Sequence, residues 1–94
     1  NYEARYAIIL NFKNDMLNLS AKNESSSIDS SLLCQKKGED LKISLNSNFL
    51  LEATQNMDSD RIQIKMSNSK SSVLLYEENN AENLYLAMPL ALRD

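Results

Sequence analysis

The sequence predicts an α+β fold in which antiparallel strands are covered by one short helix. Several short segments alternate between apolar and polar residues, as strands do when one face meets water. One central segment, residues 47–56, places its apolar residues at helical spacing instead. The chain has 94 residues, enough for one domain with a modest core. We therefore expect a single domain over residues 1–94, with strands and helix in the order ββββ-α-βββ.

Two paired strands and an edge strand are predicted for the first third of the chain. Residues 6–12 contain β-branched and aromatic side chains that favour a strand, and residues 16–21 alternate as its returning partner. Residues 13–15 form the tight connection between them. The serine-rich residues 28–35 form the next strand. Short polar side chains discourage uncontrolled pairing, so we predict that residues 25–34 lie at an edge of the sheet.

A turn, a strand and the helix follow in the middle of the chain. The only glycine, Gly38, marks a turn at residues 36–40, and residues 41–45 then alternate strictly as a strand. Asn46 or Ser47 can cap a helix, because their side chains accept hydrogen bonds from the free amides of its first turn. The helix is expected to run from Ser47 to Asn56, with an apolar face of Phe49, Leu50, Ala53 and Met57.

Three more strands are predicted after the helix. Residues 61–66 alternate cleanly, residues 67–72 are a polar connection, and residues 73–76 form the second of these strands. Residues 77–80 then turn the chain into a last strand at residues 84–88. Runs of antiparallel strands with one covering helix are typical of an α+β domain.

The C-terminal tail is the most informative stretch of the sequence, because chain ends are usually polar and this one is apolar. Pro89 cannot donate to a sheet ladder, so we expect it to end the last strand and leave Leu90 and Leu92 near the surface. Two interpretations of this pattern are open. The tail is either the ragged end of a core strand or an apolar binding ledge built by the C-terminus itself.

Composition argues against a metal site, a nucleophilic enzyme and a membrane helix. The chain has no histidine and one cysteine, Cys34, which excludes zinc sites and Ser-His or Cys-His pairs within it. We interpret Cys34 as a small buried hydrophobe in a reducing cytoplasm. Asp58 and Asp60 lack the further ligands of a calcium loop and indicate a plain turn. No run approaches the roughly 20 apolar residues that a membrane helix needs.

The charge balance is slightly acidic. The net charge is −3, from 10 basic and 13 acidic residues. Non-specific affinity for DNA comes from neutralising phosphates, so this domain is not expected to hold a phosphate backbone by itself. Any contact with DNA must be indirect or local, which suits a topological tether better than a protein that reads base sequence.

Several segments, taken in order, resemble a known family. They are Ile8-Ile9-Leu10-Asn11-Phe12 and Leu17–Asn23 near the start, then Asn46–Ala53, Met57–Ile64 and Ser69–Leu75, and finally Tyr85-Leu86-Ala87-Met88-Pro89-Leu90. Together they are similar to the C-terminal domain of the bacterial replicative sliding clamp, the beta subunit of DNA polymerase III. The resemblance covers nearly the whole chain and implies the DNA clamp fold.

The resemblance implies a non-catalytic processivity factor of DNA replication. In this family, three such domains per chain close head-to-tail, as a homodimer, into a ring around duplex DNA. The implied partners are the catalytic subunit of DNA polymerase III, the clamp loader, and other clamp-binding polymerases and repair proteins, which dock short linear peptides. A cytoplasmic location is also implied, with no cofactor and no membrane contact.

The resemblance also implies a second helix on the same side of the sheets, before Tyr6. That helix is absent from this sequence, so we expect an N-terminally truncated domain with a partly open apolar face.

The family assigns two sets of residues by position. The peptide-binding pocket matches Asn46, Phe49, Lys70, Ser72, Leu86, Ala87, Met88, Pro89, Leu90, Ala91 and Leu92. The subunit-interface edge strand matches Ser27, Ile28, Ser30 and Leu32. Two positions depart from the family pattern, because the residue at Lys70 is usually apolar and the residue at Ala91 is usually basic. Lys70 is equally well interpreted as a solvated loop charge, and Leu86 and Ala87 as parts of a core strand.

Two other classes of function fit the sequence less well. A small β-rich structural or adhesion domain outside the cytoplasm would suit the serine- and asparagine-rich strands and the acidic charge, but not the single cysteine. An enzyme is the weakest interpretation. The local carboxylate groupings, Glu77 with Glu78 and Asp58 with Asp60, lie in turn signals without an acid–base partner.

Overall fold

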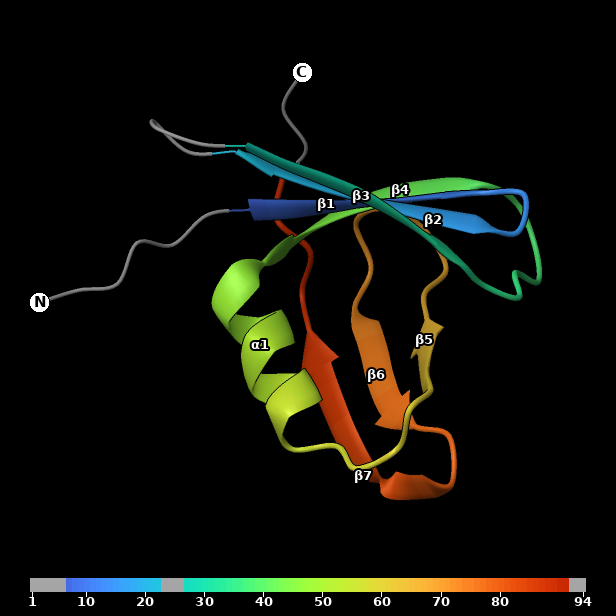
Figure 1. The fold of residues 1–94 in the computed structure, drawn as a ribbon, viewed down its shortest axis with the longest axis vertical. Coiled ribbons are helices and arrows are strands. Elements are labelled where there is room, and N and C mark those ends of the chain that lie inside the picture. Colours follow the sequence, from blue (N-terminus) through green and yellow to red (C-terminus); the bar gives the residue numbers. More distant parts are fainter. Residues whose placement is uncertain (1–6, 23–26, 92–94) are drawn as a thin grey trace, which may run out of the picture.

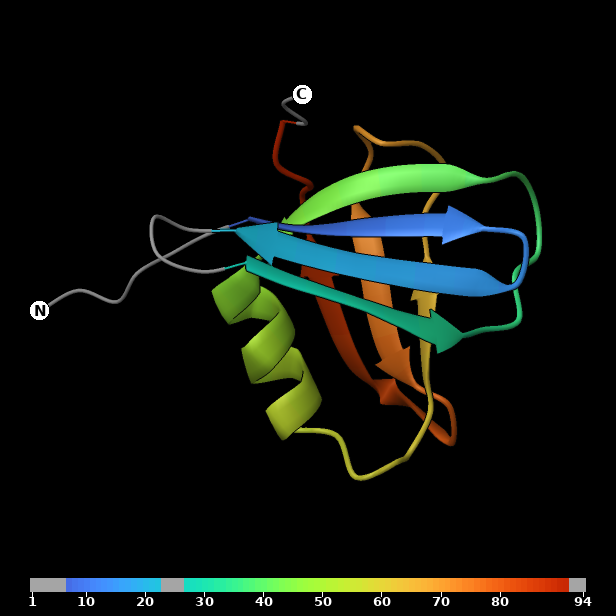
Figure 2. The same ribbon diagram turned by 45° about the horizontal axis from the view of Figure 1, so that its top comes forward.

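Two antiparallel sheets and one helix make up the computed structural model, which describes residues 7–22 and 27–91 (Figure 1). Figure 1 shows the first sheet edge-on across the top, with the helix and the second sheet below it, and Figure 2 turns the face of the first sheet toward the viewer. The first sheet has the strand order β3 (Ser27–Leu33), β2 (Met16–Lys22), β1 (Ala7–Lys13) and β4 (Leu41–Asn46). The second sheet has the order β5 (Ile62–Lys65), β6 (Val73–Glu77) and β7 (Asn80–Ala87). Along the chain, helix α1 (Ser47–Gln55) follows the last strand of the first sheet and precedes the first strand of the second.

The predicted order of strands and helix is confirmed, but the last strand is longer than predicted. It begins at Asn80 rather than at residue 84, and it ends at Ala87 rather than at residue 88. The β6–β7 ladder passes a bulge and continues to the pair Glu77–Asn80. The turn is therefore only residues 78–79, and β7 starts at Asn80 because this residue pairs with Glu77 and not because the sequence alternates there.

Side-chain chemistry explains the tight turn between β1 and β2 and the longer loop between β3 and β4. Asn14 has a φ of 56°, a left-handed conformation that asparagine tolerates better than most residues. Its backbone N–H donates to Oδ1 of Asp40 at 3.0 Å, and Nζ of Lys36 pairs with the same oxygen at 2.8 Å. Both bonds lower the pKa of the Asp40 carboxyl below its ordinary 3.8, and the bond from Lys36 has the larger effect. Gly38 has a φ of 99°, which favours glycine.

Helix α1 begins with an asparagine cap, one of the two caps that the sequence predicts. Oδ1 of Asn46 accepts a hydrogen bond from the backbone N–H of Asn48 at 2.8 Å. Near the other end, Oγ1 of Thr54 donates to the carbonyl of Leu50 at 2.9 Å. Ala53 is fully buried, so the helix packs closely where it meets the core.

The core lies where the two sheets and the helix meet. Truncating a buried leucine or isoleucine to alanine costs about 2–5 kcal/mol, so these side chains dominate the stability of the fold. Among the described residues, no helix is long and apolar enough to span a membrane. The buried apolar residues are Leu10, Phe12, Leu17, Ile43, Leu45, Ala53, Val73 and Leu75.

Candidate functional site

The last strand presents a row of apolar side chains to solvent. Successive side chains of a strand point to opposite faces, which places Leu84, Leu86 and Met88 together on the outer side of β7 and its continuation. Their exposed fractions are 50%, 63% and 64%. Tyr85 and Ala87 point the other way and pack against the core. The row is therefore an apolar surface with a packed layer directly behind it.

Beyond Ala87 the chain attaches to the first sheet. The backbone N–H of Leu90 donates to the carbonyl of buried Ser44 at 2.8 Å and forms an isolated bridge to β4. The strand ends before Pro89, and Leu90 is 39% exposed, as predicted, but its backbone is fixed rather than ragged. Leu92 lies outside the described residues. We name Leu86, Met88, Pro89 and Leu90 the C-terminal ledge.

The polar loop before β6 reaches the same end of the second sheet. Val73 pairs with Ala87, so Ser72 lies level with the end of β7. The side chain of Asn68 accepts a hydrogen bond from the backbone N–H of Lys70 at 2.8 Å, which closes a turn in this loop. Lys70 and Ser72 are both exposed, and the fold thus brings them toward the ledge.

Another predicted pocket residue, Phe49, lies behind the ledge. The ring of Phe49 packs edge-on against the ring of Tyr85, with centroids 6.4 Å apart and an interplanar angle of 76°. Tyr85 is on the core side of β7, so Phe49 supports the strand from the face opposite Leu86. The side chain of Asn46 caps α1, and Asn46 is the last residue of β4, the strand to which Leu90 is bridged.

The predicted edge strand lies at an edge. β3 pairs with β2 at one end of the first sheet, and all of its residues are exposed. Ile28 and Leu32 are 58% and 49% exposed. The prediction covered residues 25–34, of which residues 25–26 lie outside the described part of the chain. β3 ends at Leu33, one residue before Cys34.

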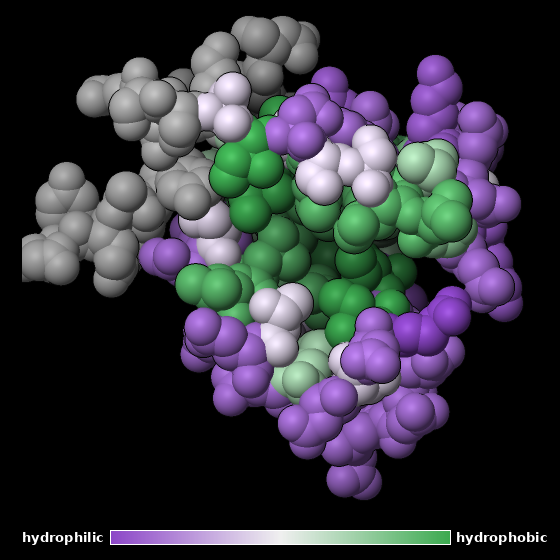
Figure 3. Space-filling view, in the orientation of Figure 1, coloured by the Kyte–Doolittle hydropathy of each residue, from purple (hydrophilic) through white to green (hydrophobic). Residues whose placement is uncertain are grey.

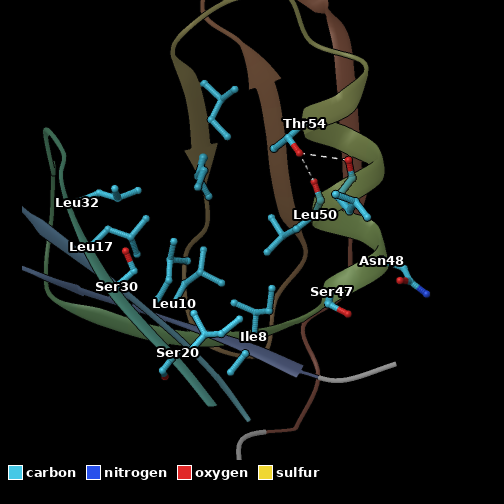
Figure 4. Close-up of a pocket in the computed structure, with 16 residues that line it drawn as sticks. Ile8, Leu10, Leu17, Ser20, Ser30, Leu32, Ser47, Asn48, Leu50 and Thr54 are labelled. Atoms are coloured by element: carbon cyan, nitrogen blue, oxygen red, sulfur yellow. Dashed lines mark hydrogen bonds between the residues drawn. The ribbon is translucent and has the colours of Figure 1, made fainter. Parts of the chain in front are cut away.

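An open apolar groove separates β3 from helix α1. Its volume is about 510 Å³, and Figure 3 shows it as a hollow of hydrophobic surface with hydrophilic residues around it. Figure 4 shows its walls, with Leu10, Leu17 and Leu32 on the side of the first sheet and Leu50 on the side of α1. Its apolar lining is Ile8, Leu10, Leu17, Leu19, Ala21, Ile28, Leu32, Leu50, Leu51, Ile62 and Ile64, and its polar lining is Ser20, Ser30, Ser47, Asn48 and Thr54.

The sequence predicted an open apolar face but not the residues that line the groove. One signal was present in the helix, where Leu51 is an additional apolar residue outside the predicted apolar face of Phe49, Leu50, Ala53 and Met57. Leu51 is 57% exposed and lines the groove. Ile62 and Ile64 of β5 also line the groove. Their place there depends on how the two sheets pack, so the local sequence pattern could not predict it.

Glu77 has a structural role that sequence reasoning missed. Its carboxylate is buried and accepts hydrogen bonds from the backbone N–H groups of Asp58 at 2.7 Å and Ser59 at 2.6 Å. Nδ2 of Asn83 donates to its other oxygen at 3.0 Å. The Asn83 bond and then the backbone bonds lower the pKa of Glu77 below its ordinary 4.5, although burial opposes this. Glu77 therefore fastens the loop after α1 to the β6–β7 hairpin.

Among residues 7–22 and 27–91, no group of three histidine, cysteine or carboxylate side chains could hold a metal ion. Asp58 and Asp60 belong to the loop that Glu77 holds, consistent with the predicted turn. The surfaces offer exposed leucine, isoleucine and methionine side chains beside short polar ones.

The chain is similar in sequence and in fold to bacterial beta sliding clamps. Residues 1–91 match the family described as the C-terminal domain of the DNA polymerase III beta subunit. A beta sliding clamp of Pseudomonas aeruginosa is 28% identical over 86 residues, which is 90% of this chain and 23% of that protein. The Bartonella birtlesii DnaN sliding clamp bound to griselimycin superposes with a TM-score of 0.82 and 31% identity, over 92% of this chain and 24% of that one.

A more distant structure shares the fold. The DNA polymerase III beta subunit of Thermotoga maritima superposes with a TM-score of 0.84 and 22% identity, over 93% of this chain and 24% of that one. The chain thus spans about a quarter of the length of the relatives it matches.

Proposed function

The chain belongs to the family formed by the C-terminal domain of the DNA polymerase III beta subunit, and on this premise we propose that it forms a peptide-docking part of a replicative sliding clamp. The observation that carries this proposal is the C-terminal ledge. Leu86 and Met88 are 63% and 64% exposed, and Leu90 beside them is fixed to β4. A fixed apolar surface is pre-organised for a ligand, because little conformational freedom is lost on binding.

The ledge is suited to a short peptide with two or three apolar side chains. Each apolar side chain that becomes buried contributes about 1.5–3 kcal/mol before the cost of ordering the peptide. Two such anchors with a few hydrogen bonds correspond to roughly micromolar affinity, about −8 kcal/mol. In the clamp, the occupants would be segments of the replicative polymerase, the clamp loader and other clamp-binding polymerases and repair proteins.

Lys70 and Ala91 adjust the preference of this surface. Both are exposed, and they replace an apolar and a basic residue of the family pattern. Lys70 adds a positive charge to the loop that reaches the end of β7. We propose that it favours peptides with an acidic residue next to the apolar anchors.

The proposed role is mechanical rather than catalytic. The whole clamp would encircle duplex DNA as a homodimer in the cytoplasm and tether the polymerase, with β3 as the edge that meets the neighbouring protomer. Helix α1 contains no lysine or arginine and carries Glu52. Phosphate contacts of this 94-residue domain are therefore few, and its part in the clamp is docking and closure.

We further propose that the apolar groove is covered in the whole clamp. An exposed apolar hollow of about 510 Å³ is unusual for a surface that stays in water. The family places a second helix on this side of the sheets. A helix with leucine-sized side chains would fill the groove between α1 and β3, and these 94 residues would then be part of a larger domain.

A peptide titration tests the docking proposal. The probe is a labelled peptide with a leading glutamine and a leucine–phenylalanine end, and binding is followed by fluorescence anisotropy. Met88→Ser is expected to weaken binding about tenfold, since tenfold equals 1.4 kcal/mol, the lower end of what one buried apolar side chain contributes. The matched control is Leu33→Ser, which changes an 85% exposed leucine on β3 and should leave affinity unchanged.

Two results would refute docking at the ledge. One is equal peptide affinity for Met88→Ser and the unmodified chain. The other is an equal loss of affinity in Met88→Ser and Leu33→Ser, which would indicate non-specific apolar adhesion.

A further inference from the structure

The outer face of the second sheet is more apolar than a solvent-facing sheet surface usually is. In an antiparallel sheet with one face toward water, that face is normally polar, and directly paired residues share a face. Leu74 pairs with Leu86 of the C-terminal ledge. At the next pair on the same face, Tyr76 pairs with Leu84. Leu74, Tyr76 and Leu84, which we name the outer strip, therefore continue the ledge across β6 and β7.

The outer strip is accessible and its aromatic ring is fixed. Leu84 is 50% exposed, and Leu74 and Tyr76 are half-buried. Oη of Tyr76 donates to Oε1 of Gln63 at 2.9 Å, which sets the direction of the ring. Contiguous exposed apolar surface marks sites of interaction, and a fixed surface loses little conformational freedom when a ligand binds.

A positive charge adjoins the strip. Lys65 of β5 pairs with Leu74, and its Nζ lies 5.5 Å from the centroid of the Tyr76 ring. Lys65 is exposed, and within the part of the chain that the structure describes it forms no ion pair. Glu78, at the hairpin end of β6, lies 3.7 Å from Nε of Arg61 instead. The charge of Lys65 is therefore available to an acidic group of a ligand.

We propose that the outer strip is a second subsite for the peptide docked on the ledge, and that it takes an apolar residue with an acidic residue close to it. The proposal rests on the docking function proposed above. Leu86 belongs to the ledge and adjoins Leu74, so one peptide can occupy both surfaces, and Lys65 pairs with the acidic residue. Ile62 and Ile64, which line the groove, point to the other face of β5. A helix in the groove and a neighbour at β3 would therefore leave the strip open.

Extended peptides test the second subsite. The short probe is the glutamine-leading peptide with the leucine–phenylalanine end, and two extended probes add leucine, alanine and glutamate to its N-terminus or to its C-terminus. Fluorescence anisotropy with the 94-residue chain gives each affinity. One extended probe is expected to bind about tenfold more tightly than the short probe, because one further apolar side chain is buried. Lysine in place of its glutamate should weaken binding about threefold, since exposed charge pairs contribute little.

Variants of the chain locate the gain in affinity. Leu84→Ser should remove most of the difference between the extended and the short probe, and Lys65→Gln should abolish the preference for glutamate over lysine. The matched controls are Leu33→Ser on β3 and Lys37→Gln in the loop between β3 and β4, both at exposed residues, and they should keep the gain and the preference. Circular dichroism confirms that all four variants are folded.

Four results would overturn the second subsite while leaving docking at the ledge intact. They are equal affinities of the short and extended probes, a gain that persists in Leu84→Ser, a preference for glutamate that persists in Lys65→Gln, and equal losses in the control variants. If none of the probes binds the chain, the docking function itself is refuted, and the second subsite with it.

Discussion

Strands β3 and β7 are both edge strands that expose leucines, yet the rest of the molecule holds them differently. β3 is exposed along its whole length and is attached through β2 and the side chain of Asn18. On β7, Tyr85 packs against Phe49, and Nδ2 of Asn83 donates to Glu77 and also to the carbonyl of Asn56 at 2.9 Å. The chain beyond β7 is fixed to β4.

The difference shows that exposure alone does not identify a binding surface. Leu86 on β7 and Ile28 on β3 are 63% and 58% exposed, which is nearly the same. Behind Leu86 stands a packed layer, so the apolar row of β7 is held rigidly, as the proposed peptide docking requires. Ile28 belongs to an unpaired edge beside an open groove, so β3 is suited to another strand.

The largest expected effect comes from removing the layer behind β7. Tyr85→Ala loses the contact with Phe49 and part of the core, and it should lower the free energy of unfolding by about 2–4 kcal/mol. Urea denaturation measures this change. Leu84→Ala, on the outer side of the same strand, should cost about 0.5 kcal/mol or less. Equal losses would mean that the two sides of β7 are not differently packed.

A smaller effect is expected from detaching the tail beyond β7. Leu90→Pro removes the N–H that donates to the buried carbonyl of Ser44, and it should cost about 1–3 kcal/mol. Ala91→Pro is the control, because the backbone N–H of Leu90 is retained. Thermal denaturation compares the two variants. If the two variants have the same melting temperature, the hydrogen bond from Leu90 to Ser44 does not hold the ledge in place. β7 and β3 would then differ less in how firmly they are held than the geometry indicates.

The third effect appears in the dependence of stability on pH. The folded-state pKa of Glu77 is lowered, so its stabilisation is present above its ordinary pKa of 4.5 and is lost as the pH falls below that value through the folded pKa. Glu77→Gln should reduce the slope of the unfolding free energy against pH in this range. Glu78→Gln changes the neighbouring exposed carboxylate and should leave the slope in place. A curve unchanged by Glu77→Gln would show that this carboxylate does not fasten β7.

Much of the fold could be predicted from local patterns. Alternation located β2, β4 and β5, and β-branched and aromatic residues located β1. Helical spacing located α1, and the missing N–H of Pro89 placed the end of the last strand to within one residue. The first half of β7 could not be located in this way. Residues 80–83 are polar except for Ala81, and they belong to the strand because the hairpin turn at residues 78–79 brings Asn80 opposite Glu77.

The candidate site was only partly accessible from sequence. The apolar residues Met88 and Leu90, on either side of Pro89, marked the ledge. Phe49 was assigned to the same pocket, and its ring packs against Tyr85 on the core side of β7, because the side of a helix that faces a strand depends on packing rather than on residue type. Leu92, the last residue assigned to the pocket, lies outside the described residues.

By itself the sequence determined the elements of this protein and their order, because backbone preference and hydrophobic spacing act within a few residues. It also determined the polar edge strand and the family. Only the tertiary structure decided where the exposed apolar side chains lie and which residues stand beside them. Three features bring together segments that are distant in sequence, and they form only once the two sheets have packed. They are the buried carboxylate of Glu77, the bridge from Leu90 to Ser44, and the groove between α1 and β3.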